Sequence, residues 1–349
     1  MYFFKSQIQN IKVMKNLILN KPISVVFDVT KKCNHRCNTC NIWRSIGSEN
    51  DMSVANIKDK INILSKFGVG YIFVQGGEPL IRGDIQEIII SCIEKSIKPT
   101  IVTNGTLLTS EMMTFLQKYS CNLAISLDSL DKNVYLKTRG VDTLDNVLNN
   151  IQMASKYKIK GNKAITTTVN QLNFKEVWKL KDFSERYGFM YAIRPYIYTE
   201  RAGRKEDELI YKNKESIIEV FKKMALISKK ENFLASLIYE KHIQYLKSEE
   251  LGRCDALTRS FLMKEDGSCS YCIEFPDKIF SKFSGYKEFI NDYNKAIYKY
   301  DDEIVRCSKN TPCFFNCAWS VGILWNSKKR IIYNAPRIIK SMLTYGYFF

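Results

Sequence analysis

The chain has 349 residues, of which 45% are hydrophobic, 26% are charged and 7 are proline, so its composition excludes a disordered chain. Its length allows one large α/β domain, or a domain of about 200 to 250 residues with a smaller appendage. Its net charge of +17 makes an anionic partner a hypothesis to test.

Strand-like runs rich in β-branched and aromatic residues alternate with helical stretches from residue 23 onward. We expect strands at 23–29, 71–75, 100–103, 123–127, 164–169 and 190–194. We expect helices at 53–67, 84–97, 109–119, 142–157 and 173–187. Good helix starts are Ser53, Asp84, Thr109 and Asn173, and good stops are Gly68, Gly70 and Gly188. The alternation predicts a parallel, right-handedly wound sheet, either open or closed as a barrel.

Polar or glycine-rich turns follow four consecutive predicted strands. They are the cysteine loop "CNHRCNTC" (33–40), "QGGEP" (75–79), "TNG" (103–105) and "SLDS" (126–129). Functional residues of such folds lie at the carboxyl ends of the strands. Four such turns on one rim therefore predict a functional site there.

The sequence changes character after about residue 200. A charged connector and helical sequence precede a short, irregular, cysteine-rich stretch, which we expect to be held by metal rather than by a large core. The expected divisions are a basic N-terminal segment (1–22), a core (23–200), a helical connector (201–253), a cysteine-rich region (254–320) and a basic, aromatic tail (321–349).

Nine of the 11 cysteines fall in two groups, at 33–40 and 254–317. Cys92 and Cys121 stand alone in apolar surroundings, and we expect them to be buried thiols. No signal peptide is evident at the N-terminus, and no apolar run reaches the roughly 18 residues of a spanning helix. The chain is therefore expected to be cytoplasmic, with metal-bound thiolates rather than disulfides.

Three cysteines, Cys33, Cys37 and Cys40, lie within eight residues. A structural zinc site needs a fourth ligand, and His35 lies where its ring would diverge from the thiolates, so we expect a solvated ring or one that only contacts the ligands. An iron–sulfur cube usually takes four cysteines. Three would leave one iron without a protein ligand, and an open position is typical of a catalytic metal site.

The cysteine loop followed by "GGEP", "TNG" and "SLD" resembles the radical S-adenosylmethionine (radical SAM) enzymes over about residues 20 to 200. The resemblance implies a partial (β/α)6 barrel of the TIM type. It also implies a [4Fe–4S] cluster on Cys33, Cys37 and Cys40, whose fourth iron binds SAM. Reductive cleavage of SAM would give a 5′-deoxyadenosyl radical that abstracts hydrogen from a substrate.

The same resemblance assigns roles along the rim. Gly76 and Gly77 would let backbone carbonyls approach the SAM ammonium group, with Glu78 adding charge and Pro79 stiffening the turn. Arg139 resembles an arginine that pairs with the SAM carboxylate. Further expected SAM contacts are Asn104, Ser126, Asp128 and Asn170, with substrate placement as the alternative for Asp128 and an ordinary turn role as the alternative for both asparagines and for Thr168.

The loop departs from the family at Thr39, where relatives commonly carry an aromatic residue that packs near adenine. Trp43 is the candidate replacement, and a buried core tryptophan is the alternative.

The later cysteines resemble the SPASM extension of radical SAM enzymes, which holds auxiliary iron–sulfur clusters. Cys254 and Cys272 fit C-x12-G-x4-C, and Cys307, Cys313 and Cys317 fit C-x5-C-x3-C. The full pattern has a further cysteine where this sequence has Ile304, and another downstream. The resemblance therefore implies one auxiliary [4Fe–4S] cluster, on Cys254, Cys272, Cys313 and Cys317, with Cys307 as a substitute ligand and Cys269 as an extra. A structural zinc is the alternative.

We expect an enzyme that modifies a peptide or protein, as SPASM-type relatives often do, with a flavodoxin or ferredoxin as electron donor. A small molecule, tetrapyrrole or lipid precursor is the alternative substrate. A zinc-stapled nucleic-acid-binding protein would explain the charge but not "GGEP" and "SLD", so nucleic acid is not an expected partner. The basic ends are either solvated or in peripheral contact with an anionic membrane surface.

Overall fold

The computed structural model describes residues 2–44, 51–197, 207–249, 251 and 254–310. Its centre is one nine-stranded sheet in the order β6-β5-β4-β3-β2-β1-β7-β8-β9. The first six strands are β1 (Ser24–Thr30), β2 (Tyr71–Gly76), β3 (Lys98–Thr103), β4 (Asn122–Ser126), β5 (Lys163–Val169) and β6 (Met190–Pro195). All six are parallel, and each pairs with the next in the chain. The predicted partial (β/α)6 barrel is confirmed.

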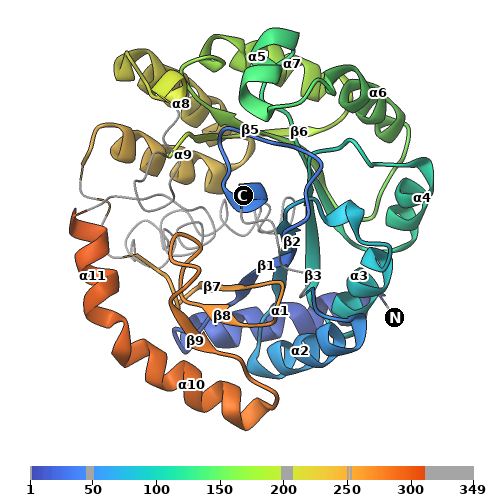
Figure 1. Cartoon of the computed structure of the whole chain (residues 1–349), viewed down its shortest axis with the longest axis vertical. Coiled ribbons are helices and arrows are strands. Elements are labelled where there is room, and N and C mark those ends of the chain that lie inside the picture. Colours follow the sequence, from blue (N-terminus) through green and yellow to red (C-terminus); the bar gives the residue numbers. More distant parts are fainter. Residues whose placement is uncertain (1, 45–50, 198–206, 250, 252–253, 311–349) are drawn as a thin grey trace.

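Five predicted helices cover the outer side of this curved sheet (Figure 1). They are α2 (Val54–Phe67), α3 (Ile85–Glu94), α4 (Ser110–Lys118), α6 (Leu144–Ser155) and α7 (Val177–Arg186). Alternate β1 residues, Val25, Phe27 and Val29, are fully buried in the same core as Ile57 and Ile61 of α2. The period of two in the strand and of about four in the helix thus produces one shared apolar layer.

All four predicted helix starts stand at the N-cap position of a helix, and two of them cap it with a side-chain hydrogen bond. The hydroxyls of Ser53 and Thr109 accept hydrogen bonds from the backbone N–H groups three residues later. The carboxylate of Asp84 instead binds the Arg82 guanidinium, at 2.7 and 2.8 Å. The Asn173 side chain donates to the Asp128 carbonyl, which lies far away in sequence. Asp84 and Asn173 therefore stand where predicted, before α3 and before the 3-10 helix Phe174–Glu176, but their side chains make other contacts instead of capping the helix.

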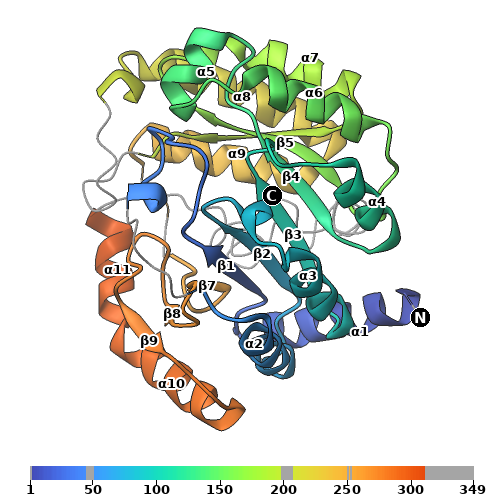
Figure 2. The ribbon, with the colours of Figure 1, turned by 45° about the vertical axis from the view of Figure 1, so that its right-hand side comes forward.

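Two helices within the first 200 residues were not predicted. Helix α1 (Tyr2–Ile18) lies beside α2 and α3 below the sheet (Figure 2). Helix α5 (Lys132–Arg139) is short and polar, and it begins where Asp131 accepts bonds from the N–H groups of Asn133 and Val134. It ends at Gly140, which has a positive φ of 70°.

Residues 254–310 continue the central sheet. Strand β7 (Ser260–Met263) pairs in parallel with β1, and β8 (Cys269–Ser270) and β9 (Ile279–Ser281) follow as antiparallel strands. Phe289 and Tyr293 of α10 (Tyr286–Lys299) pack edge-on against Phe67 of α2. The described part of the cysteine-rich region therefore shares the main apolar core. We had expected few such contacts, because its strands are too short to give a periodic signal.

The expected helical connector is present as α8 (Lys214–Glu231) and α9 (Phe233–Leu246), and α11 (Asp301–Asn310) ends the described chain. Tyr239 of α9 accepts a hydrogen bond from the backbone of Ile193 in β6, which joins the connector to the last parallel strand. Within the described ranges, no helix is long and apolar enough to cross a bilayer. The predicted tail (321–349) lies outside the described residues.

Candidate active site

The cysteine loop follows the carboxyl end of β1, as predicted. Cys37 is buried, whereas Cys33 and Cys40 are half-buried. Burial raises the pKa of Cys37 to about 12 and also raises the pKa of Cys33, and the nearby thiols contribute to both shifts. The three thiols are therefore close neighbours. Their thiolate forms are stabilised when a bound metal balances the negative charge.

In the described part of the chain, no three cysteine, histidine or acidic side chains converge on a single point, as one bound ion would require. Cysteines of an iron–sulfur cluster each bind a different iron, so they need to face a shared space rather than meet. The Cys33 sulfur also accepts a hydrogen bond from the backbone N–H of His35, at 3.4 Å. Hydrogen bonds to sulfur are among the features that set cluster potentials. The donor set fits a cluster better than a closed zinc site.

The loop is held on one side by the last carbonyls of α5. The backbone N–H groups of Arg36 and Asn38 donate to the carbonyls of Arg139 and Thr138, at 3.2 and 3.0 Å. The Asn38 side chain donates to the Lys137 carbonyl at 2.8 Å. A helix leaves its final carbonyls without intrahelical partners, and here the cysteine loop supplies those partners.

On its other side the loop is held by the turn after β3. The side chain of Asn104 donates to the side chain of Asn34, which donates in turn to the Thr106 hydroxyl, both at 2.7 Å. Asn104 was predicted to contact SAM, and that role stays a prediction. In the structure its side chain connects the turn to the cysteine loop.

The "GGEP" turn lies against the start of the loop. The N–H groups of Gly77 and Glu78 donate to the carbonyls of Thr30 and Lys32, at 2.7 and 2.8 Å. A Cβ atom at Gly77 would lie 2.1 Å from the Lys32 oxygen, and one at Gly76 would lie 2.4 Å from the Thr30 oxygen. Both glycines are therefore required for this close backbone approach. Their predicted contact with the SAM ammonium group stays a prediction.

Substitution of Gly77 by alanine is expected to lower the free energy of unfolding by about 1–3 kcal/mol, because the new methyl group must displace the loop backbone. Gly83→Ala is the matched control, since a Cβ there meets nothing within 4 Å. Urea denaturation of both variants measures the difference. Equal midpoints for the two would contradict the close approach.

Glu78 is buried and joins two strand ends. Its carboxylate accepts hydrogen bonds from the Thr103 hydroxyl and the Asn104 N–H, both at 2.7 Å, and from the Leu80 N–H at 3.0 Å. Burial nevertheless raises its pKa above the ordinary value. Pro79 follows as the buried first residue of a short 3-10 helix, Pro79–Ile81. The expected stiffening of the turn by this proline is consistent with that position.

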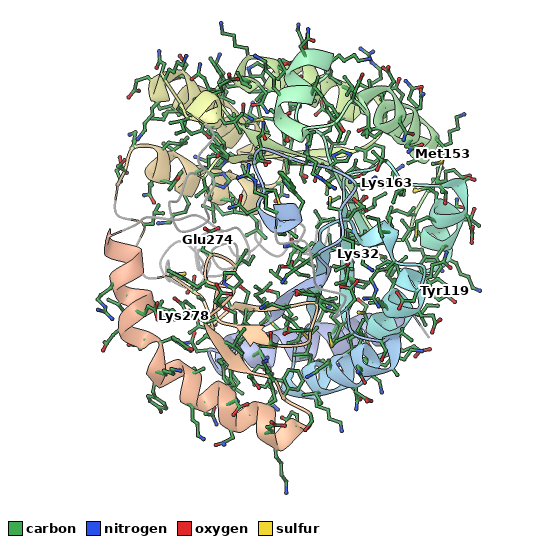
Figure 3. The ribbon with its side chains drawn as sticks, viewed as in Figure 1. Lys32, Tyr119, Met153, Lys163, Glu274 and Lys278 are labelled. Atoms are coloured by element: carbon green, nitrogen blue, oxygen red, sulfur yellow. The ribbon has the colours of Figure 1, made fainter. Side chains whose placement is uncertain are left out.

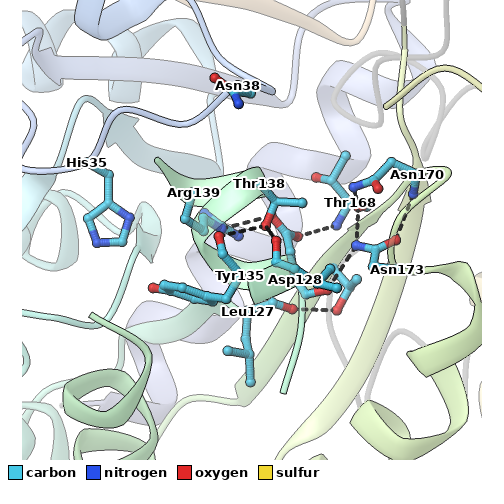
Figure 4. Close-up of polar contacts among 12 residues, drawn as sticks. His35, Asn38, Leu127, Asp128, Tyr135, Thr138, Arg139, Thr168, Asn170 and Asn173 are labelled. Atoms are coloured by element: carbon cyan, nitrogen blue, oxygen red, sulfur yellow. Dashed lines mark hydrogen bonds and ion pairs between the residues drawn. The ribbon is translucent and has the colours of Figure 1, made fainter. Parts of the chain in front are cut away.

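Asp128 and Arg139 form a buried ion pair, with Nε and Oδ2 2.8 Å apart (Figure 4). The other Asp128 carboxylate oxygen accepts from the Thr168 N–H at 2.8 Å. Burial alone would lower the pKa of Arg139, but the charge of Asp128 and contact with the Cys37 thiol raise it above the ordinary value. In the structure Arg139 thus interacts with both Asp128 and Cys37. Its pairing with a SAM carboxylate, and the SAM contact of Asp128, stay predictions.

The remaining predicted contacts differ in accessibility. Ser126 is half-buried at the end of β4, opposite Thr166 of β5. Asn170 is fully buried, where its side chain donates to the Thr168 carbonyl and accepts from the Leu172 N–H. The turn role weighed for Asn170 is therefore present in the structure.

For His35 in the loop and Trp43 just after it, the structure contradicts one of the two expected roles. Trp43 is half-buried, not a core residue: it donates to the Cys37 carbonyl at 3.0 Å, and the guanidinium groups of Arg36 and Arg44 lie 5.5 and 5.1 Å from its ring centre. His35 is buried rather than solvated, and its Nε2 lies 3.2 Å from the Thr143 hydroxyl. Burial and the Arg139 charge lower the pKa of His35 to about 3, so its ring is neutral.

Asp28 is a polar residue of this region that we did not predict. It lies half-buried in β1, and Gln75 of β2 donates to it at 3.2 Å. Burial raises the pKa of Asp28 from 3.8 to about 6; the Gln75 hydrogen bond opposes this, the Glu265 charge adds to it, and Lys31 and Lys264 oppose it. The signal in the sequence was a lone carboxylate within the apolar run "ISVVFDV".

Asp28→Asn is expected to stabilise the fold at pH 7.5 by about 1–3 kcal/mol. The folded state holds the Asp28 proton more tightly than the unfolded state, so this carboxyl lowers the free energy of unfolding as the pH rises from about 4 to 6. Above that range the loss stays constant. Near pH 3.5 both states are protonated, and the two proteins should have equal midpoints. Urea denaturation across this pH range checks the sign, and a constant difference at all pH values would contradict it.

The described cysteines of the second group fall into two kinds. Cys254 and Cys272 are half-buried, and the Cys272 sulfur accepts from the Glu274 N–H at 3.3 Å, as Cys33 does from His35. Glu274 lies nearer the centre of the molecule than Lys278 (Figure 3). Cys269 is fully buried in β8, and burial raises its pKa. The Cys307 side chain, Cys313 and Cys317 lie outside the described residues, so the auxiliary ligand set stays a prediction.

Cys92 and Cys121 are fully buried, as predicted, and burial raises the pKa of Cys121 to about 12. No disulfide links any of the eight cysteines whose side chains are described.

Comparison with known proteins finds a family match over part of the chain. Residues 27–184 match the model of the radical SAM superfamily. A probable GTP 3′,8-cyclase of Pyrococcus abyssi is 31% identical over 187 residues, which cover 53% of this chain and 59% of the relative. The Fe-coproporphyrin III synthase of Methanosarcina barkeri is 31% identical over 168 residues, which cover 47% of this chain and 41% of the relative. The chain thus spans about half the length of these curated relatives.

Two solved structures resemble a larger share of the chain. Streptococcus suis SuiB bound to precursor peptide SuiA covers 90% of this chain with a TM-score of 0.64, and 73% of SuiB is matched. The protein anSMEcpe with bound AdoMet and Cp18Cys peptide covers 91% of this chain with a TM-score of 0.62, and 98% of that protein is matched. Both are 17% identical to this chain, so these likenesses establish the fold.

Proposed function

Since residues 27–184 form a radical SAM domain, we propose that this chain is an enzyme that holds a [4Fe–4S] cluster on Cys33, Cys37 and Cys40 and binds S-adenosylmethionine beside it. The observation that carries the proposal is the three-cysteine loop, fixed on one side by α5 and on the other by the Asn34–Asn104 contact. When bound, the cluster supplies the electron that cleaves SAM and starts radical chemistry on a substrate.

The residues around the loop position its thiolates. The α5 carbonyls fix the backbone at Arg36 and Asn38, on either side of Cys37. The Arg139 charge lowers the pKa of Cys37, against the larger opposing effect of burial, and so favours the thiolate that iron requires. Asp128 holds the Arg139 guanidinium in place. The buried Glu78 carboxylate fixes the "GGEP" turn, which contacts the start of the cysteine loop.

The proposed substrate is a peptide or protein, and a flavodoxin or ferredoxin is the proposed electron donor. The fold likeness to SuiB with its precursor peptide and to anSMEcpe with its peptide supports this choice, because it extends beyond the matched domain. The proposal includes one auxiliary cluster bound by cysteines among Cys254, Cys272, Cys307, Cys313 and Cys317. The Cys272 sulfur, which accepts a backbone hydrogen bond, supports that part.

A small-molecule substrate is the second candidate. The relatives with about 30% identity support it, because they are GTP 3′,8-cyclases and a Fe-coproporphyrin III synthase. Consumption of GTP or of a coproporphyrin by the reduced enzyme would favour this candidate over a peptide.

The test of the proposed activity uses the full chain, purified without oxygen. Iron, sulfide and zinc contents are measured, and 5′-deoxyadenosine is quantified after addition of SAM and a strong reductant. We expect iron with sulfide, and reductant-dependent 5′-deoxyadenosine. Zinc without sulfide, or intact SAM in the presence of a full iron–sulfur complement, would contradict the proposal.

A further inference from the structure

Helix α1 is attached to the body of the protein along one face. Val13 and Leu17 are buried against Ile23 and Tyr71. Gln9 donates to the Gly70 carbonyl at 2.9 Å, and the Asn16 side chain donates to the Pro22 carbonyl at 2.7 Å. Lys12 donates to the Ser65 hydroxyl and the Lys95 carbonyl, both at 2.7 Å. The orientation of the helix is therefore fixed, and its opposite face is presented outward.

That opposite face is apolar. Ile11, Met14, Ile18 and Leu19 are 67, 52, 67 and 51% exposed, and they line a shallow groove with Asn10 and Lys15. Their spacing of three and four residues places Ile11, Met14 and Ile18 on one stripe of the helix. Ten large apolar side chains are exposed in the described part of the chain, and four of them lie within these nine residues. We call these four residues the α1 apolar stripe.

The surroundings of the stripe are basic. Residues 1–27 contain Lys5, Lys12, Lys15 and Lys21 and no acidic residue. The first acidic residue of the chain is Asp28. Lys15 borders the groove. Lys66 and Lys95 are exposed on segments that α1 contacts, and Glu94 beside Lys95 offsets one of these charges. An apolar stripe with a lysine at its border and further lysines on neighbouring segments is typical of helices that lie in the interface of an anionic membrane.

We propose that α1 docks this protein onto an anionic lipid surface, with the α1 apolar stripe inserted below the headgroups and Lys15 at headgroup level. A second copy of the chain fits less well, because a two-fold contact through this face would bring its lysines against the same lysines. The helix contacts residues that precede β1, β2 and β3, whereas the cysteine loop follows the carboxyl end of β1. Lipid contact would therefore leave the cysteine loop uncovered.

Vesicle co-sedimentation of the full chain tests this docking. The wild type should bind vesicles that contain phosphatidylserine, and binding should fall with added salt and on vesicles of phosphatidylcholine alone. The variant Ile11→Asp/Ile18→Asp should lose about tenfold or more of its binding, since two inserted side chains become charged. Its control is Leu226→Asp/Tyr298→Asp, which makes the same charge change at side chains 66 and 84% exposed on α8 and α10.

Each outcome decides the proposal. Equal binding of the two double variants, or equal binding to the two lipid compositions, overturns it. Sedimentation velocity without lipid identifies self-association: a wild-type dimer that the α1 variant dissociates, together with no vesicle binding, would assign the stripe to a second copy. Absence of both effects also overturns lipid docking. The readout does not depend on SAM cleavage, so failure of this proposal is separate from failure of the proposed activity.

Discussion

Replacement of Cys37 by alanine is expected to abolish reductant-dependent 5′-deoxyadenosine formation, with a loss larger than the roughly 100-fold that removal of an outer partner of a metal site can cause. Cys37 is buried, stands between the other two cysteines of the loop in the sequence and interacts with Arg139. The loop has no further cysteine to replace it. The measurements are iron content, the visible absorption spectrum and 5′-deoxyadenosine yield.

Cys92→Ala is the matched control, because it also removes a buried sulfur but lies in α3 among apolar residues. That substitution should cost about 1 kcal/mol of stability and leave iron content and SAM cleavage unchanged. Persistent SAM cleavage by the Cys37 variant would show that the loop is not the cluster site. Equal losses in both variants would point to general unfolding rather than to loss of a ligand.

Asp128→Ala is expected to lower the free energy of unfolding by about 3–5 kcal/mol, because it leaves the Arg139 guanidinium buried without its counter-charge. It also removes the acceptor of the Thr168 N–H. Urea denaturation measures the change. The double variant Asp128→Ala/Arg139→Met should be less destabilised than the sum of the single changes, since neither charge is then left alone.

Lys132→Ala is the control, because it removes an exposed ion pair made by α5, the same helix that carries Arg139. Lys132 pairs with Asp142 at 3.1 Å, but both side chains are more than half exposed, so solvent and salt screen the interaction. We expect no measurable change in its urea midpoint. If Asp128→Ala behaves like this control, the buried pair contributes nothing to stability.

The parallel core could be predicted from the sequence because its signals are local. The β1 run "SVVFDVT" and the helix that begins after Ser53 each carry their own periodicity and end signals. The rim site could be predicted because parallel strands bring successive turns to one edge, whatever the turns contain. Cys33, Gly77, Asn104 and Asp128 accordingly lie in four such turns.

The contacts that hold the site could not be predicted, because they join residues far apart in sequence. Asn38 donates to the carbonyl of Thr138, and Asn34 binds Asn104. Helix α5 was missed since it is eight residues long and mostly polar, although Asp131 and Gly140 marked its ends. Strand β7 has four residues and becomes recognisable only beside its partner β1.

The pairing of β7 with β1 has a consequence for the order in which the chain can fold during synthesis. The edge of β1 that pairs with β7 stays unpaired until residue 263 has left the ribosome, and this residue follows β1 by more than 200 positions. At typical synthesis rates this delay is about 10 to 50 s. Throughout that interval an apolar strand offers unpaired backbone groups to any neighbour, and such edges promote aggregation. A nascent chain of this protein is therefore expected to depend on chaperones until its last parallel strand arrives.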